Sequence, residues 1–131
     1  MNAYSNMANT YKNQQVMTAS PEELTLMLYN GAIRFVSESI LALDNNAVEK
    51  AHHANLRAQD IVREFRATLD MSYDLSKGLD QLYEYIEYRL IQGNLKKDKA
   101  QLEEAKGMLV ELRDTWVEAM KLARQQRAVA R

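Results

Sequence analysis

One short stretch of the sequence has the spacing of metal ligands. Glu49 and His52 form a Glu-x-x-His pair, which places a carboxylate and an imidazole on one face of a helix. A dinuclear metal bundle requires two such pairs and further inward-facing carboxylates, and this sequence contains no second pair. His53 follows directly, so the two imidazoles would point about 100° apart. We therefore expect neither a metal site nor a cofactor.

Three tyrosines at 83, 85 and 88 could stack on the bases of single-stranded nucleic acid. Acidic residues such as Glu84 and Glu87 are interleaved with them and would repel a phosphodiester. We expect the rings to pack against apolar side chains instead, with one or two exposed as contact residues.

No other pattern points to catalysis. The sequence lacks a glycine-rich phosphate loop and a nucleophile elbow, and it has no cysteine to act as a nucleophile or to ligate zinc or iron–sulfur clusters. We therefore expect a protein that is not an enzyme and that has no catalytic residues.

The composition limits the class of partner. The 131 residues fit one domain, and the formal net charge is −1, with basic and acidic residues interleaved. Such a surface lacks the single-sign charge that nucleic-acid binding requires. Residues 1–20 do not have the pattern of a signal peptide, and no stretch approaches the roughly 18 consecutive apolar residues typical of a membrane span. We expect a cytoplasmic protein without membrane insertion.

A strong helix start lies where polar N-terminal residues give way to an apolar stretch. Ser20 is suited to the N-cap, Pro21 to the first helical position, and Glu23 completes a capping box. The apolar residues that follow, through Leu43, cover roughly 260° of the helix circumference at about 100° per residue. This helix therefore has more apolar surface than one bundle interface needs.

Three more helices are predicted from apolar residues spaced alternately three and four positions apart. The second begins near residues 45–46, the third near 72–74, ending at a left-handed cap at Gly93 and Asn94, and the fourth near Asp98. Their expected seams are Val48, Ala51, Asn55, Ala58, Val62, Phe65 and Leu69; Leu75, Leu79, Leu82, Ile86 and Leu90; and Leu102, Ala105, Leu109, Leu112, Trp116, Ala119 and Ala123. Short connections make neighbours antiparallel, so the predicted fold is all-α, an up-down-up-down four-helix bundle.

Two residues inside these helices have alternative interpretations. Gly31 indicates either a close approach of helices or room for a guest side chain, because an interior glycine costs about 1 kcal/mol relative to alanine. Asn55 lies on an apolar stripe and needs a hydrogen-bond partner if it is buried. It either sets the register of the helices or contacts a ligand.

The polar N-terminal arm, residues 1–17, precedes the bundle at 18–124 and a flexible basic tail at 125–131. Tyr4, Met7 and Tyr11 share one face if the arm forms a short helix. The arm is then either a disordered terminus or a detachable cap over the surplus apolar surface of the bundle. A detachable cap would indicate a protein that binds an apolar segment of another polypeptide.

Several longer motifs resemble one known family. The segments TASPEEL at 18–24 and LYNGAIRF at 28–35 are similar to the opening of the flagellar secretion chaperones of flagellin, the FliS family. LYEYI at 82–86, with Arg89, Leu90, Asn94 and Asp98, resembles the signature of that family's third helix, and LRDTW at 112–116 resembles its last-helix tryptophan motif. The sequence departs from the pattern at Asn30 and Glu84, where Asp is usual, at Glu87 and Tyr88, where a basic residue is common before Arg89, and at Gly93, where Ala is usual.

The resemblance implies a cytoplasmic export chaperone. Such a protein binds the disordered C-terminal segment of flagellin, prevents premature polymerisation and delivers flagellin to the type III export gate of the flagellum. Its N-terminal segment packs on the bundle and is displaced by flagellin. From the residues, we expect Tyr4, Met7 and Tyr11 to form the cap and Leu24, Met27, Leu28 and Tyr83 to form the docking surface. The oligomeric state is expected to be a monomer or a weak homodimer, and the alternative function is a structural or regulatory bundle acting as a homodimer.

Overall fold

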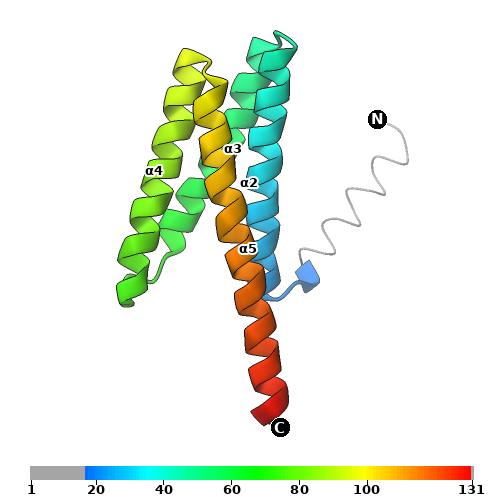
Figure 1. Cartoon of the computed structure of the whole chain (residues 1–131), viewed down its shortest axis with the longest axis vertical. Coiled ribbons are helices and arrows are strands. Elements are labelled where there is room, and N and C mark those ends of the chain that lie inside the picture. The colour runs from blue at the N-terminus through cyan, green and yellow to red at the C-terminus, as the bar shows by residue number, and fades with distance from the viewer. Residues whose placement is uncertain (1–16, 131) are drawn as a thin grey trace, which may run out of the picture.

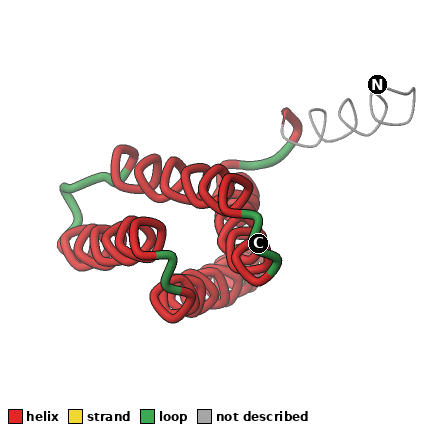
Figure 2. The backbone as a smooth tube through the Cα atoms, turned by 90° about the horizontal axis from the view of Figure 1, so that it is seen from above, coloured by secondary structure: helices red, strands yellow, loops and turns green. Residues whose placement is uncertain are grey.

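The computed structural model describes residues 17–130, which fold as an antiparallel four-helix bundle without β-strands (Figure 1). Viewed from above, the helices form a ring in which α2 and α4 each pack against both α3 and α5 (Figure 2). The predicted fold class is therefore confirmed. The helices are α2 (Pro21–Asp44), α3 (Val48–Thr68), α4 (Asp74–Lys96) and α5 (Lys99–Ala130). The proposed division of the chain at residues 17 and 124 stays a prediction.

The start of α2 follows the local sequence. The Ser20 hydroxyl accepts a hydrogen bond from the backbone N–H of Glu23 (3.2 Å), and the Glu23 carboxylate accepts one from the backbone N–H of Ser20 (3.4 Å). Pro21 occupies the first turn. The predicted capping box is therefore confirmed. Both of its bonds join residues three apart, so it does not depend on the rest of the molecule.

The core lies along the axis of the bundle. Its largest fully buried apolar side chains come from all four helices: Val36, Val62, Ile86, Leu90, Leu102 and Leu109. Asn55 is buried among them and donates to the carbonyl oxygen of Leu90 on α4 (3.1 Å) while accepting from Gln59 (2.6 Å). This pairing satisfies the amide and links α3 to α4, as expected of a polar residue that sets helix register.

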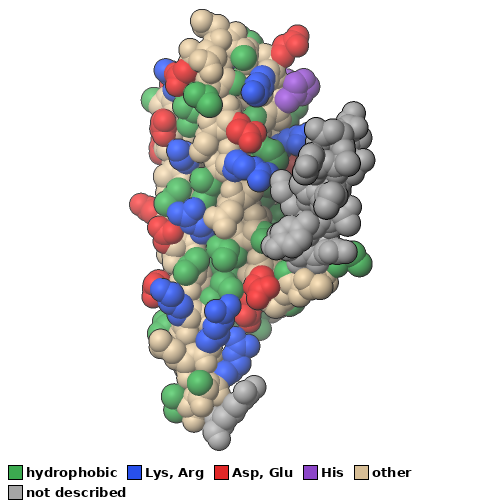
Figure 3. All heavy atoms as spheres, turned by 90° about the vertical axis from the view of Figure 1, so that its right-hand side faces the viewer, with side chains coloured by type: hydrophobic (Ala, Val, Ile, Leu, Met, Phe, Trp, Pro, Cys, Tyr) green, Lys and Arg blue, Asp and Glu red, His purple; other side chains and the backbone are tan. Residues whose placement is uncertain are grey.

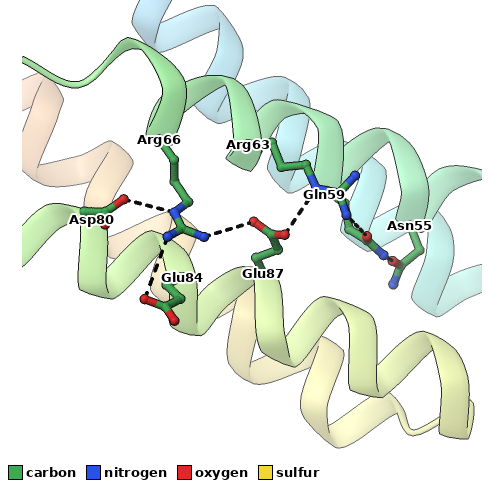
Figure 4. A network of polar contacts seen from close by, with 7 residues as sticks. All are labelled: Asn55, Gln59, Arg63, Arg66, Asp80, Glu84 and Glu87. Atoms are coloured by element: carbon green, nitrogen blue, oxygen red, sulfur yellow. Dashed lines mark hydrogen bonds and ion pairs between the residues drawn. The ribbon is translucent and has the colours of Figure 1, made fainter.

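Charged residues continue this link between α3 and α4 (Figure 4). Arg63 Nε lies 3.1 Å from Glu87 Oε1, and Arg66 Nε lies 2.9 Å from Asp80 Oδ1. Arg66 also lies 3.7 Å from Glu84 and 3.6 Å from Glu87, so one guanidinium faces three carboxylates. The network joins the last turns of α3 to α4 between Asp80 and Glu87.

The expected end of the third helix was wrong. α4 continues through Gly93 and Asn94 to Lys96, and the left-handed residue is Lys97, with φ 51°. An added Cβ at Gly93 would lie 2.6 Å from Cδ2 of the buried Leu102. Gly93 therefore permits close packing of α4 against α5 instead of ending the helix.

The predicted α4 seam was also wrong at two positions. Leu75 is 76% exposed and Leu82 is 41% exposed, whereas Tyr83 is buried in line with Ile86. Leu82 and Tyr83 are adjacent and point in different directions, so only one of them can face the core. Tyr83 does so because a partner on α2 satisfies its hydroxyl.

Two further expectations need correction. Val48 is 51% exposed at the start of α3 and does not belong to the seam. At Gly31 an added Cβ would lie 3.5 Å from Ile61 Cδ1, which is an ordinary van der Waals contact. A close approach of helices therefore does not require glycine there.

By length and composition alone, α2 could cross a membrane. A single helix of this kind is weak support for a membrane span, because core helices of bundles meet the same criterion. Here Tyr29, Val36 and Ile40 of α2 are buried in the bundle against α3 and α5.

The surface is of mixed charge on the face shown in Figure 3, where Lys and Arg side chains are interspersed with Asp and Glu.

Candidate binding groove

The bundle opens at the end where α2 begins and α3 gives way to α4. In Figure 1, α4 and α5 lie close together at the top and diverge toward the bottom. Side chains from all four helices line a groove of about 530 Å³ between these diverging ends. Its principal apolar side chains are Phe65, Leu69, Leu75, Leu79, Leu112 and Trp116.

The apolar wall follows from the pattern on α4 and α5. Leu75 and Leu79 are one helical turn apart at the start of α4, and Leu112 and Trp116 are one turn apart on α5. Higher in the bundle, the same stripes meet and form the core. Where the helices diverge, nothing within the described residues covers Leu75, which is 76% exposed.

Three aromatic rings in contact with one another form one side of the groove. The ring of Phe65 lies 4.6 Å from that of Tyr29 and 5.3 Å from that of Tyr83, measured between centroids. The hydroxyl oxygens of Tyr29 and Tyr83 are 2.7 Å apart and form a buried hydrogen bond. Burial raises the pKa of both tyrosines, so the pair is neutral at physiological pH.

The other side-chain donors along the groove are already bonded within the protein. The indole N–H of Trp116 donates to the carbonyl oxygen of Glu22 on α2 (3.0 Å). Each threonine of the lining donates to the carbonyl four residues earlier: Thr25 to Pro21 (3.1 Å), Thr68 to Glu64 (2.9 Å) and Thr115 to Glu111 (2.9 Å). These bonds leave mainly methyl groups and rings to face a guest.

A second, smaller hollow extends the apolar surface along α4 and α5. It measures about 160 Å³ and is lined in part by Leu82 and Met108. It shares Leu112 and Thr115 with the groove, so the two hollows are neighbours on the surface. An elongated apolar segment fits such a surface better than a compact small molecule does.

The expected docking residues are placed differently from one another. Tyr83 lines the groove. Leu24 and Leu28 are partly buried on α2, Met27 is 38% exposed, and none of these three lines the groove. The expected cap residues, Tyr4, Met7 and Tyr11, lie outside the described residues.

Sequence reasoning did not select most residues of the groove. It assigned Leu75, Leu79 and Trp116 to the core seam, because a periodic stripe does not reveal where two helices diverge. A usable signal was present in α4, whose apolar stripe begins at Leu75, in the first turn. A stripe that reaches the very end of a helix extends to where neighbours cover it least.

The residues with ligand chemistry are not assembled into a site. Within residues 17–130, no group of three or more His, Cys, Asp or Glu side chains is placed to hold a metal ion. His52 lies beside Asn94 of α4, with Nδ1 2.8 Å from the amide nitrogen. Of the three tyrosines for which one or two exposed rings were expected, Tyr85 is 36% and Tyr88 53% exposed, and Tyr83 is buried.

The fold and the groove define an all-α bundle with an open apolar groove at one end. A family model described as flagellar protein FliS matches residues 4–123. The flagellar secretion chaperone FliS of Bacillus subtilis is 36% identical over 125 residues, covering 95% of this chain and 94% of the relative. The proteins of the same name from Salmonella typhimurium and Escherichia coli are 33% and 32% identical, covering 77% and 80% of this chain and 77% and 79% of the relatives.

The chain therefore belongs to the FliS family of flagellar secretion chaperones, and the resemblance of its motifs is confirmed. Members of this family are chaperones and not enzymes, which agrees with the role expected from the sequence.

Proposed function

We propose that this chain is an export chaperone whose groove holds the disordered C-terminal segment of flagellin. The observation that carries the proposal is the open apolar groove between α2, α3, α4 and α5. Leucines and aromatic rings dominate its lining, and Leu75 at its rim is 76% exposed. An amphipathic helix formed by the guest would remove this surface from water.

The physical chemistry predicts binding that is moderate and releasable. Each large apolar side chain buried on binding contributes about 1.5–3 kcal/mol. Ordering an unfolded guest opposes this by about 1–2 kcal/mol for each residue whose backbone becomes fixed. The two contributions nearly cancel, so affinity depends on a few well-buried anchors in the groove, with Tyr83 as the proposed contact among the expected residues. Leu24, Met27 and Leu28 stay proposed docking residues on α2.

Occupancy of the flagellin segment would prevent premature polymerisation in the cytoplasm, because that segment joins flagellin subunits. Moderate affinity would then allow release when the complex reaches the type III export gate of the flagellum. These steps are proposed from the family of the chain, and flagellin polymerisation assays with and without the chaperone test the first of them.

We also propose that the N-terminal arm, residues 1–17, competes with flagellin through Tyr4, Met7 and Tyr11. Deletion of residues 1–17 should then tighten binding of a flagellin C-terminal peptide or speed its association in calorimetry or stopped flow. Unchanged affinity and unchanged kinetics would remove this role.

Two leucines on α4 provide a matched test of the groove. Leu75 is 76% exposed inside the groove, and Leu95 is 73% exposed at the other end of the same helix, outside it. Because both side chains are largely exposed, glutamate at either position should leave the fold intact. Leu75→Glu should weaken binding of the flagellin peptide at least tenfold, whereas Leu95→Glu should not change it.

Isothermal titration calorimetry with the full chain measures the effect, and light scattering gives the oligomeric state in the same samples. Equal effects of the two substitutions would place the guest elsewhere on the bundle. A stable dimer that does not bind the peptide would overturn the proposal and favour a structural or regulatory homodimer.

A further inference from the structure

The two tyrosines of the groove carry one more proton than their own hydrogen bond uses. A phenolic hydroxyl has one O–H donor and can also accept. The oxygens of Tyr29 and Tyr83 are 2.7 Å apart, so one hydroxyl donates to the other. The hydroxyl that accepts still has its own proton. Both residues line the groove and are largely buried, Tyr29 being 5% and Tyr83 4% exposed.

That proton is the one side-chain donor of the described groove lining that the protein does not use itself. The three lining threonines and Trp116 all donate to backbone carbonyls. Asp70 is an acceptor and takes both its hydrogen bonds from Ser72. A guest that fills the groove therefore meets an apolar surface with one unused side-chain donor and one exposed carboxylate, that of Asp70.

No cationic side chain lines the groove in residues 17–130. A carboxylate of the guest would be buried there without an opposite charge, which is unfavourable. A neutral acceptor, such as the side-chain oxygen of Asn, Gln, Ser or Thr, can accept a hydrogen bond from the tyrosine hydroxyl without that cost. The chemistry of the lining thus favours one neutral acceptor in an otherwise apolar helical face.

We propose that the Tyr29–Tyr83 pair selects the register of the guest by hydrogen bonding to one neutral polar side chain on it. This inference rests on the proposed function and specifies the chemistry of the segment that the groove accepts. In the free protein the spare proton has no acceptor among the described residues. A guest in the right register supplies one, whereas a guest in another register leaves the proton unpaired and binds more weakly.

The first test uses the protein without mutation. A flagellin C-terminal peptide is prepared in variants in which each Asn, Gln, Ser or Thr is replaced by an apolar residue of similar shape. One replacement should weaken binding about tenfold, which corresponds to about 1.4 kcal/mol. The others should change it little or strengthen it.

The second test couples the peptide to the tyrosines. The Tyr29→Phe/Tyr83→Phe double variant has no hydroxyl in the pair. It should bind the original peptide about tenfold more weakly than the unmodified chain does, which corresponds to about 1.4 kcal/mol. The double variant should bind the peptide with the sensitive replacement at least as tightly as it binds the original peptide. Each single variant keeps one hydroxyl and its proton and should lose less than the double variant.

Tyr88→Phe is the matched control, because Tyr88 lies on the same helix, is 53% exposed and does not line the groove. It should bind every peptide as the unmodified chain does. Circular dichroism and denaturation establish that the double variant is folded, and if it is not, the peptide scan on the unmodified chain decides.

Two negative outcomes are distinguishable. If the peptide binds but no replacement weakens binding, or if the double variant binds it equally well, the selective role of the tyrosine pair is overturned and the groove proposal survives. If the peptide does not bind the unmodified chain at all, the proposed function fails, and this inference fails with it.

Discussion

The indole nitrogen of Trp116 lies 3.0 Å from the carbonyl oxygen of Glu22, which joins α5 to the first turn of α2. The same indole forms part of the groove wall. One side chain therefore connects the stability of the bundle to the shape of its groove, and it is the only tryptophan of the chain.

Removing this contact should destabilise the bundle in two steps. Trp116→Phe loses the hydrogen bond and should lower the free energy of unfolding by about 1 kcal/mol. Trp116→Ala also loses most of the packing, and should cost about 3 kcal/mol, the lower end of the range for buried tryptophan, because the side chain is only partly buried. Chemical denaturation measures both. Equal, small losses for the two variants would show that the indole contributes little to folding.

The single tryptophan should also report occupancy of the groove. A guest that covers Trp116 removes water from the indole, so its emission should shift to shorter wavelength when the flagellin peptide binds. Leu75→Glu should reduce the shift at peptide concentrations that just saturate the unmodified chain. Tight calorimetric binding with unchanged emission would place the guest outside the groove.

Two of the four helical glycines, Gly31 and Gly93, should respond to alanine in opposite directions. Gly31→Ala adds a methyl group at ordinary contact distance, 3.5 Å from Ile61, and should stabilise the chain by about 0.5–1 kcal/mol through helix propensity. Gly93→Ala places a methyl group 2.6 Å from the buried Leu102, and this overpacking costs about 1–3 kcal/mol. The gain in helix propensity at Gly93 should be about as large as at Gly31, and the overpacking cost exceeds it, so the net effect should be destabilising.

Thermal and chemical unfolding of the two glycine variants provide the comparison. Gly107→Ala is the control for propensity alone, because an added Cβ there has no neighbour within 4 Å. A stabilising Gly93→Ala would mean that Leu102 can move aside at little cost.

The charged network between α3 and α4 should depend on Arg66. Glu87 Oε2 is buried without a hydrogen bond and lies 3.6 Å from Arg66, whereas Oε1 of the same carboxylate is paired with Arg63 at 3.1 Å. Arg66→Met removes the charge beside Oε2 and leaves the carboxylate with Arg63 alone, which should cost about 1–3 kcal/mol in the free energy of unfolding. Arg34→Met removes an exposed pair with Glu38 (3.8 Å) and should cost less than about 0.5 kcal/mol.

If the two arginine variants lost equal stability, the burial of Glu87 would have no energetic consequence. Glu87→Gln added to Arg66→Met should restore part of the loss, because the amide carries no charge to leave unpaired.

The buried tyrosine pair should make the fold sensitive to alkaline pH. Burial raises the pKa of Tyr29 and Tyr83 in the folded state, whereas in the unfolded chain tyrosine ionises near pH ~10. Above that pH the unfolded state has released protons that the folded state retains, so the free energy of unfolding falls as pH rises. Below it, the pair contributes no pH dependence.

Denaturation at a series of pH values, with tyrosinate absorbance, measures this effect. The Tyr29→Phe/Tyr83→Phe variant should lose less stability between about pH 9 and about pH 11 than the unmodified chain does. Parallel pH profiles for the two proteins would show that the pair ionises normally in the folded state.

Much of the bundle could be predicted because its signals are local. The capping box at Ser20 and Glu23 forms between residues three apart, and the polar side chain of Asn55 on an apolar stripe required a partner wherever the stripe packed. Gly93 was misread because a glycine near the end of a helix fits both a left-handed cap and a tight contact. The deciding atom, Leu102 Cδ2, belongs to the next helix.

The sequence by itself determined the four helices, their antiparallel order, the surplus of apolar surface and the family. These follow from periodicity, caps and short connections, all of which act within one helix or between neighbours. Only the tertiary structure decided that Tyr83, and not Leu82, faces inward and meets Tyr29, and that the surplus lies where α4 diverges from α5. The groove is built from residues between Thr25 and Ala119 on all four helices. Its shape depends on the angles at which these helices pack, and no local sequence pattern encodes those angles.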